Sequence, residues 1–96
     1  MDLSVLTTPA VPHAIDEFEK LGRDSFLRQY GFGRARGYFI VHNGRQYDSK
    51  AIAGVAYRYL GGNRRALRPS EFDGGDRTVA KQMRALGFEV AGPLAK

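Results

Sequence analysis

Apolar residues recur at intervals of three and four in several stretches of the chain, which is the pattern of amphipathic helices. The first stretch, residues 11–21, follows a Thr-Thr-Pro start signal and is ended by Gly22. The second, residues 26–30, comes after an Asp-Ser cap and is closed by Gly31. The first third of the chain is therefore predicted to form one long and one short helix.

Residues 38–42 and 45–47 predict two short strands on either side of Asn43-Gly44. Asn-Gly between two such runs is typical of a two-residue hairpin turn. With that turn, His42 faces Arg45 and Ile40 faces Tyr47 across the strands. One face of the hairpin then carries Tyr38, Ile40, His42, Arg45 and Tyr47. Residues 88–90 predict a short third strand that joins the hairpin.

Two further helices are predicted in the second half of the chain. Asp48 or Ser49 caps the first of them, and its apolar stripe consists of Ile52, Val55, Ala56, Tyr59 and Leu60. The buried side of the last helix consists of Val79, Ala80, Met83 and Leu86, and Gly87 ends it. The sequence thus predicts a single α+β domain over residues 1–96, with a folded core of about 10–90. Four helices pack around a small antiparallel hairpin or three-stranded sheet.

Composition narrows the class of protein. The hydrophobic fraction of 43%, with 6 Phe and 5 Tyr, favours a folded domain over a disordered chain. There is no cysteine, which excludes disulfides and thiolate metal sites. No apolar run reaches the roughly 18–20 residues of a membrane span, and residues 1–12 do not resemble a signal peptide. We expect a cytoplasmic protein that binds no membrane and no cofactor.

The net charge of +5 is concentrated in the middle of the chain. Residues 1–33 carry a net −2, residues 34–84 carry a net +7, and the last twelve residues are neutral. A basic stretch of this kind is typical of a surface that binds a polyanion such as nucleic acid. The alternative is a solvated basic surface without a partner, and charge alone does not separate the two.

Two features of the sequence suit phosphate at a helix start. Lys50 comes early in its predicted helix, where free N–H groups and the helix dipole attract anions. Gly74-Gly75 precedes the last helix, and glycines let a backbone approach phosphate closely. The simpler alternatives are an exposed surface lysine and an ordinary turn.

Two other features place basic side chains together. Arg77, Lys81 and Arg84 share one face of the last predicted helix, a stripe that could follow a DNA backbone or remain solvated. Arg34, Arg36 and Arg45 lie close in sequence to the aromatic residues of the hairpin, an association that suits phosphate clamping with base stacking. The alternative for the hairpin tyrosines is a place in the core.

Catalytic chemistry has little support in the sequence. His13 and His42 have no acidic or histidine partner at metal-ligand spacing. Asp73 and Asp76 flank the double glycine and could hold Mg²⁺, although two carboxylates without a third ligand make a weak site. We therefore predict that the chain has no catalytic residues, with a Mg²⁺-dependent enzyme as the remaining alternative.

Short motifs in a fixed order resemble those of a known family. They are Phe26-Leu27, Tyr30-Gly31-Phe32, Tyr47-Asp48-Ser49-Lys50-Ala51-Ile52, Phe72-Asp73-Gly74-Gly75 and Leu86-Gly87-Phe88. Over about residues 10–90 the chain resembles the N-terminal head domain of McrA-like, HNH-type modification-dependent (type IV) restriction endonucleases.

The resemblance implies a head domain followed, in a longer polypeptide, by readers of modified DNA and a C-terminal HNH nuclease. It implies surface roles at five positions: Tyr47, Ser49, Lys50, Gly74 and Gly75. It also implies that Phe26, Phe72, Leu86 and Phe88 belong to the core.

Residues and resemblance together predict a module that binds double-stranded DNA through its phosphates. The predicted contacts are Arg34, Arg36, Arg45, Tyr47, Ser49, Lys50, Gly74, Gly75, Arg77, Lys81 and Arg84. The alternative is a head that mediates protein interaction, either with downstream domains of the same polypeptide or with a second copy in a homodimer. The DNA hypothesis requires that the loop of residues 34–36, the hairpin, the helix start at Lys50 and the last helix converge on one face.

Overall fold

The computed structural model describes residues 3–62, 64–73 and 76–92. Its elements are η1 (Leu3–Val5), α1 (Ala10–Leu21), α2 (Arg23–Tyr30), β1 (Phe39–His42), β2 (Arg45–Asp48), α3 (Ser49–Ala56), η2 (Tyr57–Leu60), η3 (Pro69–Glu71), the π-helical turn η4 (Asp76–Ala80), α4 (Lys81–Ala85) and β3 (Glu89–Ala91). Within the described residues this is the predicted α+β fold, with four α-helices and a three-stranded antiparallel sheet.

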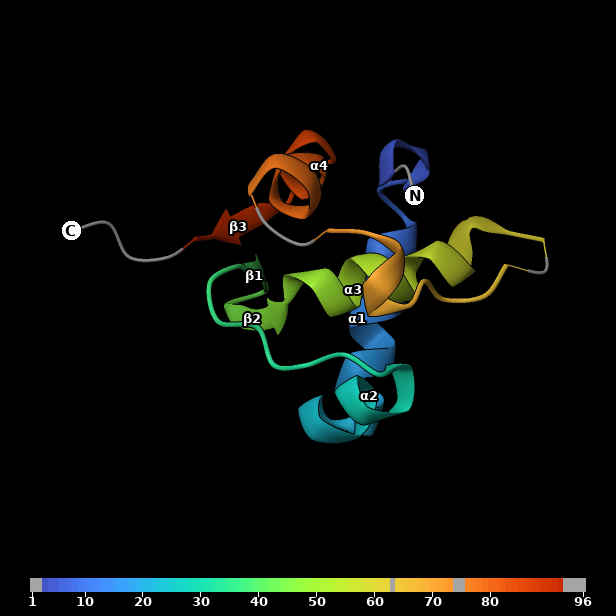
Figure 1. The fold of residues 1–96 in the computed structure, drawn as a ribbon. Helices are drawn as coiled ribbons and strands as arrows, with labels where there is room; N and C mark the ends of the chain where they lie inside the picture. The colour runs from blue at the N-terminus through green and yellow to red at the C-terminus, as the bar shows by residue number, and fades with distance from the viewer. Residues whose placement is uncertain (1–2, 63, 74–75, 93–96) are drawn as a thin grey trace.

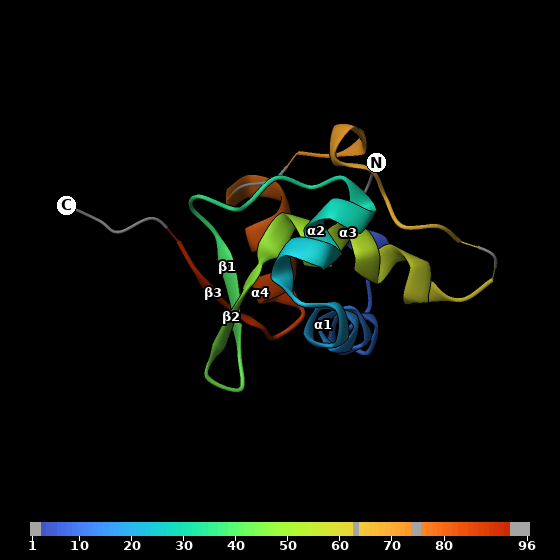
Figure 2. The same ribbon diagram turned by 90° about the horizontal axis from the view of Figure 1, so that it is seen from below.

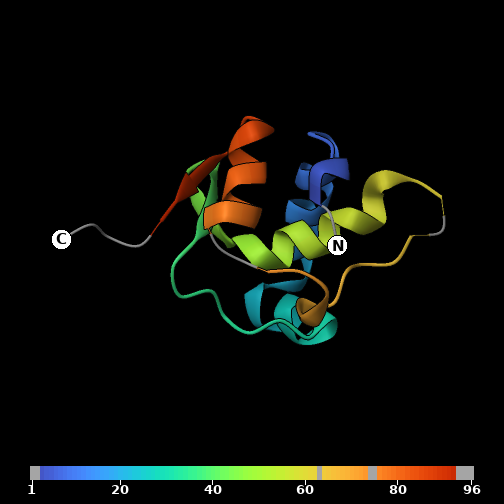
Figure 3. The same cartoon turned by 45° about the horizontal axis from the view of Figure 1, so that its top comes forward.

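Helix α3 runs through the middle of the molecule (Figure 1). The sheet lies near the N-terminal end of α3. Helices α2 and α4 lie on opposite sides of α3 (Figures 1 and 3). Helix α1 packs against both α2 and α3. The segment that follows α3 projects from the side opposite the sheet, as Figure 2 shows from below. Helix α3 therefore contacts α1, α2, β2 and the turns η2, η3 and η4.

The hairpin has the predicted register, with Ile40 opposite Tyr47 and His42 opposite Arg45. Asn43 and Gly44 both have positive φ, 52° and 77°, as a primed two-residue turn requires. The third strand, β3, pairs antiparallel with β1, so the strand order is β2-β1-β3. The prediction of a strand at residues 88–90 is thus confirmed, within one residue.

Helix α3 is buried on all sides, whereas the sequence predicted a helix with one apolar stripe. Every residue from Ala51 to Ala56 is buried. The α-helix also ends at Ala56, and residues 57–60, which include two members of the predicted stripe, continue as the 3-10 helix η2. The predicted end before Gly61 holds, although the last turn is a 3-10 helix, and several neighbouring elements enclose α3 so that more than one stripe of it is buried. Its small residues allow those elements to approach.

Gly54 is the point of closest approach to α3. A Cβ at this position would lie 2.6 Å from Cζ of Phe32 and 3.1 Å from the carbonyl oxygen of Leu67. The Leu67 N–H in turn donates to the Gly54 carbonyl at 2.9 Å. A glycine is therefore required here by space, since its φ is not in the left-handed region.

The last helix begins irregularly. Residues 76–80 form a π-helical turn before α4, which the periodicity did not predict. Val79, Ala80 and Met83 are fully buried as predicted, and Gly87 ends the helix with φ 96°. The core also includes Leu3 and Leu6, which precede the expected range of 10–90. Among the described residues, no helix combines the length and apolar character needed to cross a membrane.

Candidate nucleic-acid interface

Asp48, between β2 and α3, anchors the loop that joins α2 to β1. Its carboxylate is only 2% exposed and accepts two hydrogen bonds from the Arg23 guanidinium, both at 2.9 Å. It also accepts the backbone N–H of Ala35 at 2.7 Å. The expected cap is absent, because the Asp48 side chain makes no hydrogen bond to the first turn of α3. Instead it holds the loop of Arg34 and Arg36 beside the start of that helix.

Ser49 and Tyr47 are buried, at 3% exposure each. The Ser49 hydroxyl donates to the Tyr38 carbonyl at 2.9 Å, which joins α3 to the residue before β1. The Tyr47 hydroxyl donates to the carboxylate of Glu19 on α1, and its ring packs edge-on against Phe18. At both positions, where the resemblance implies a surface role, the side chain holds elements of the fold together.

Lys50 lies one residue further along α3 and is half-buried. Its ammonium sits 5.1 Å from the centre of the Phe72 ring, a cation–π contact. This contact brings the segment that leads to the last helix next to the start of α3. Gly74 and Gly75, and the side chain of Arg77, lie outside the described residues.

Arg34 and Arg36 are both exposed on the anchored loop. Arg34 donates to Asp24 at 2.6 Å, and this hydrogen bond holds the pKa of Asp24 below its usual value. Both side chains of the pair are more than 60% exposed, so solvent screens it and it contributes little to stability. Arg36 forms no ion pair within the described part of the chain.

Arg45 lies at the end of the hairpin and is directed toward α1. Its guanidinium donates to Glu19 at 2.9 Å. The hydrogen bond from Tyr47, followed by that from Arg45, lowers the pKa of Glu19. Arg45 therefore belongs to a different cluster from the loop of Arg34 and Arg36.

Lys81 and Arg84 are exposed on α4. The Arg84 guanidinium donates to the Val90 carbonyl at 3.3 Å, which links the helix to β3. Contacts therefore connect two of the four predicted pieces, the anchored loop and the helix start at Lys50, and bring the segment at Phe72 beside Lys50. Arg45 contacts α1 and Arg84 contacts β3 instead.

Sequence reasoning missed the role of Asp48 as an anchor. Asp-Ser before a helical pattern is typical of an N-cap, and a cap needs no partner from a distant part of the chain. Its partner Arg23 is 25 positions away, and nothing in the local pattern indicates the pairing. Among the described residues, no three His, Asp or Glu side chains gather where they could hold a metal ion.

The architecture is that of a small α+β domain, and comparison with known proteins gives its family. The family model for the ScoMcrA-like N-terminal head domain matches residues 4–92. The chain therefore belongs to that family, which confirms the resemblance found in the sequence.

A solved structure described as the Type IV phosphorothioation-dependent restriction endonuclease ScoMcrA is similar to the chain, at 32% identity and a TM-score of 0.63. The match covers 91% of this chain and 13% of that protein, so the chain corresponds to a small part of it. No protein with a curated description matches the chain.

Proposed function

We propose that this chain is the DNA-contacting head domain of a modification-dependent (type IV) restriction endonuclease. In this proposal it holds duplex phosphates with cationic side chains around the N-terminal end of α3. The family supports a place within such a nuclease, and the contacts of the cationic segments support the location of the interface. The nuclease reaction is assigned to other domains of the same polypeptide.

The observation that carries the proposal is the hydrogen bond from the Ala35 N–H to Asp48. Because Asp48 directly precedes α3, this bond places the Arg34–Arg36 loop beside the helix turn that carries Lys50. A loop held in place loses less conformational entropy on binding than a free one, so its arginines are partly preorganised for phosphate.

The proposed contacts differ in what binding requires of them. Arg36 and Lys81 are exposed and form no ion pair with a described residue, so a phosphate displaces only water and counterions. Arg34 would exchange Asp24 for a phosphate, at small cost because that pair is exposed. Lys50 would keep its ring contact and donate outward. Gly74, Gly75, Arg77 and Arg84 complete the proposed surface.

Any reading of bases or of a modification is assigned to Arg36. Arg45 and Tyr47 do not suit this role, because the first is paired with Glu19 and the second is buried. Since the similar solved protein is described as phosphorothioation-dependent, a phosphorothioate is the first modification to compare.

The test is a fluorescence-anisotropy titration of a plain duplex and a phosphorothioate duplex at two salt concentrations. About five phosphate contacts predict a log–log salt slope near −4 to −5. Arg36→Ala should weaken binding and reduce the magnitude of that slope by about one. Arg45→Ala, which removes the same charge from the hairpin cluster, should leave both nearly unchanged.

Absence of binding to either duplex at low salt, together with a dimer in sizing chromatography, would refute the proposal in favour of a protein-interaction head. The enzyme alternative built on Asp73 and Asp76 has its own check. Incubation of nucleic acid with the chain and Mg²⁺ or Mn²⁺ is expected to leave the nucleic acid unchanged.

A further inference from the structure

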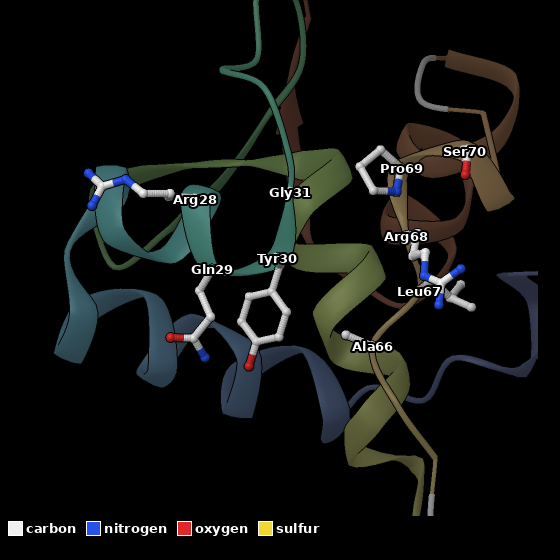
Figure 4. A pocket seen from close by; sticks show the side chains of 9 residues that line it. All are labelled: Arg28, Gln29, Tyr30, Gly31, Ala66, Leu67, Arg68, Pro69 and Ser70. Atoms are coloured by element: carbon white, nitrogen blue, oxygen red, sulfur yellow. The ribbon is translucent and has the colours of Figure 1, made fainter.

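A cleft of about 590 Å³ lies between the C-terminal end of α2 and residues 66–70. Gln29 and Tyr30 lie on the α2 side, and Arg68, Pro69 and Ser70 lie on the opposite side (Figure 4). None of the residues predicted to bind DNA lines this cleft. It is therefore a separate feature of the surface, within the size range of small-molecule sites.

The floor of the cleft is held in place from both sides. Leu67 is 2% exposed, and its N–H donates to Gly54 of α3 at 2.9 Å. On the other side, Gly31 ends α2 in the left-handed conformation, and the Phe32 N–H donates to the Leu27 carbonyl at 2.9 Å. Phe32 itself packs against Gly54. The two walls thus meet at one point on α3.

The charge of the cleft favours an anion. Its lining residues include the guanidinium-bearing Arg28 and Arg68 and no carboxylate. Figure 4 shows the Arg28 head group directed away from the opposite wall, which leaves Arg68 as the main cation. The nearby carboxylate of Glu71 is already bound by the Arg65 guanidinium at 2.6 and 2.7 Å and by the Arg68 backbone N–H at 2.7 Å.

The other lining groups suit a flat, partly apolar body. The Tyr30 ring is fixed because its hydroxyl donates to Glu17 and accepts from Arg58. Pro69 offers a second apolar surface across the cleft, and Gln29 and Ser70 supply hydrogen-bonding groups at the rim. A phosphate alone would use only the polar part of this lining.

We propose that the cleft binds a nucleoside 5′-phosphate unit, with the phosphate at Arg68 and Ser70 and the base against Tyr30 and Pro69. The unit is either a free nucleotide or one nucleotide of a DNA strand. The site is distinct from the duplex interface at α3, and its occupancy does not depend on that interface.

The test is an NMR titration of the ¹⁵N-labelled chain with deoxyadenosine 5′-monophosphate, a short single-stranded oligodeoxynucleotide, and inorganic phosphate. The amides of Gly31 and of residues 66–68 should shift with the first two probes, and inorganic phosphate should bind more weakly. Tighter binding of the oligonucleotide than of the mononucleotide would assign the site to a strand, and equal binding would assign it to a free nucleotide.

Arg68→Ala is expected to weaken nucleotide binding by about tenfold, since a hydrogen bond to a charged group is lost. Arg64→Ala is the matched control, because Arg64 is exposed in the same segment but stacks on Tyr57 and does not line the cleft. It should change the affinity less than twofold. Arg36→Ala should leave the nucleotide affinity of the cleft unchanged even if it abolishes duplex binding.

Three results would overturn the proposal. They are equal losses in the Arg64 and Arg68 variants, amide shifts confined to residues outside the cleft, and inorganic phosphate binding as tightly as the nucleotide. The first two would indicate diffuse attraction to a basic surface or a site elsewhere, and the third would remove the role of the base. Each is independent of whether the duplex interface exists.

Discussion

The basic side chains on the α1 side of the molecule differ from those around the start of α3. On the α1 side, Arg58 and Arg45 are each paired with a carboxylate of that helix, Glu17 or Glu19. Around the start of α3, Arg34 has only the exposed partner Asp24, and Arg36 is exposed and forms no ion pair with a described residue. The net charge of a stretch of sequence therefore overstates the charge that remains for a ligand.

On the α1 side, tyrosine hydroxyls also donate hydrogen bonds to the same carboxylates. Glu17 accepts hydrogen bonds from Tyr30 and Tyr59, and Glu19 accepts one from Tyr47. These carboxylates join α1 to α2, η2 and β2. We infer that charge on the α1 side serves stability and that charge on the α3 side is left for binding. Each of the following predictions tests this division.

The largest effect is expected from Asp48→Ala, at the boundary of the two regions. The change leaves Arg23 and the Ala35 N–H without their buried acceptor and should lower the free energy of unfolding by about 2–4 kcal/mol. Asp24→Ala breaks an exposed, solvent-screened pair instead and should cost much less. Urea denaturation of both variants measures the difference, and similar losses would contradict the role of Asp48 as an anchor.

Glu17→Gln should destabilise the chain by about 1–2 kcal/mol, because the neutral amide replaces a charged acceptor of two hydroxyls and removes the partner of Arg58. Glu89→Gln, at an exposed position on β3, serves as the control and should stay within about 0.5 kcal/mol. If thermal unfolding shows no difference between the two variants, the α1 cluster does not stabilise the fold.

Alkaline pH should weaken the tyrosine–glutamate contacts on the α1 side before other contacts. Burial, and then a hydrogen bond to Glu19 or Glu17, raises the pKa of Tyr47 and of Tyr59 to about 12. The protonated hydroxyls are favoured in the folded state, so their contribution to stability is complete below pH 10 and is lost as the pH rises through 12. Tyr47→Phe should flatten this decline in unfolding experiments between pH 9 and 12, and an unchanged profile would argue against it.

The smallest effect on stability is expected on the α3 side. Arg36→Ala should change the free energy of unfolding by less than about 0.5 kcal/mol, because the side chain is exposed and its loop is held by the backbone of Ala35. The same urea experiment measures it. A loss above 1 kcal/mol would show that Arg36 stabilises the fold. It would contradict the inference that charge on the α3 side is left for binding.

Local signals were sufficient for most of the fold. Asn43-Gly44 predicted the hairpin and its register, and glycines at 22 and 31 predicted where α1 and α2 end. These signals work because they depend on backbone conformation within a few residues. The enclosure of α3 was not predictable in this way, since it depends on elements far away in the sequence, such as α1.

The candidate site was less predictable than the fold. The register itself placed Tyr47 opposite Ile40, so the pattern held a signal that this tyrosine belongs to the core. The pairing of Arg45 with Glu19 could not be predicted from a local pattern, because the two residues are 26 positions apart. The sequence offers several other carboxylates as partners. The number of charges can be counted in the amino-acid sequence, whereas tertiary contacts decide which of those charges are neutralised by ion pairs.

The space at Gly54 has a consequence for the evolution of this family. An alanine there would bring its Cβ to within 2.6 Å of the Phe32 ring, so substitution at one position is not independent of the other. Relatives with alanine at the position of Gly54 are expected to carry a side chain smaller than phenylalanine at the position of Phe32. The pair should therefore covary when many members are aligned, even though the two are 22 positions apart along the chain.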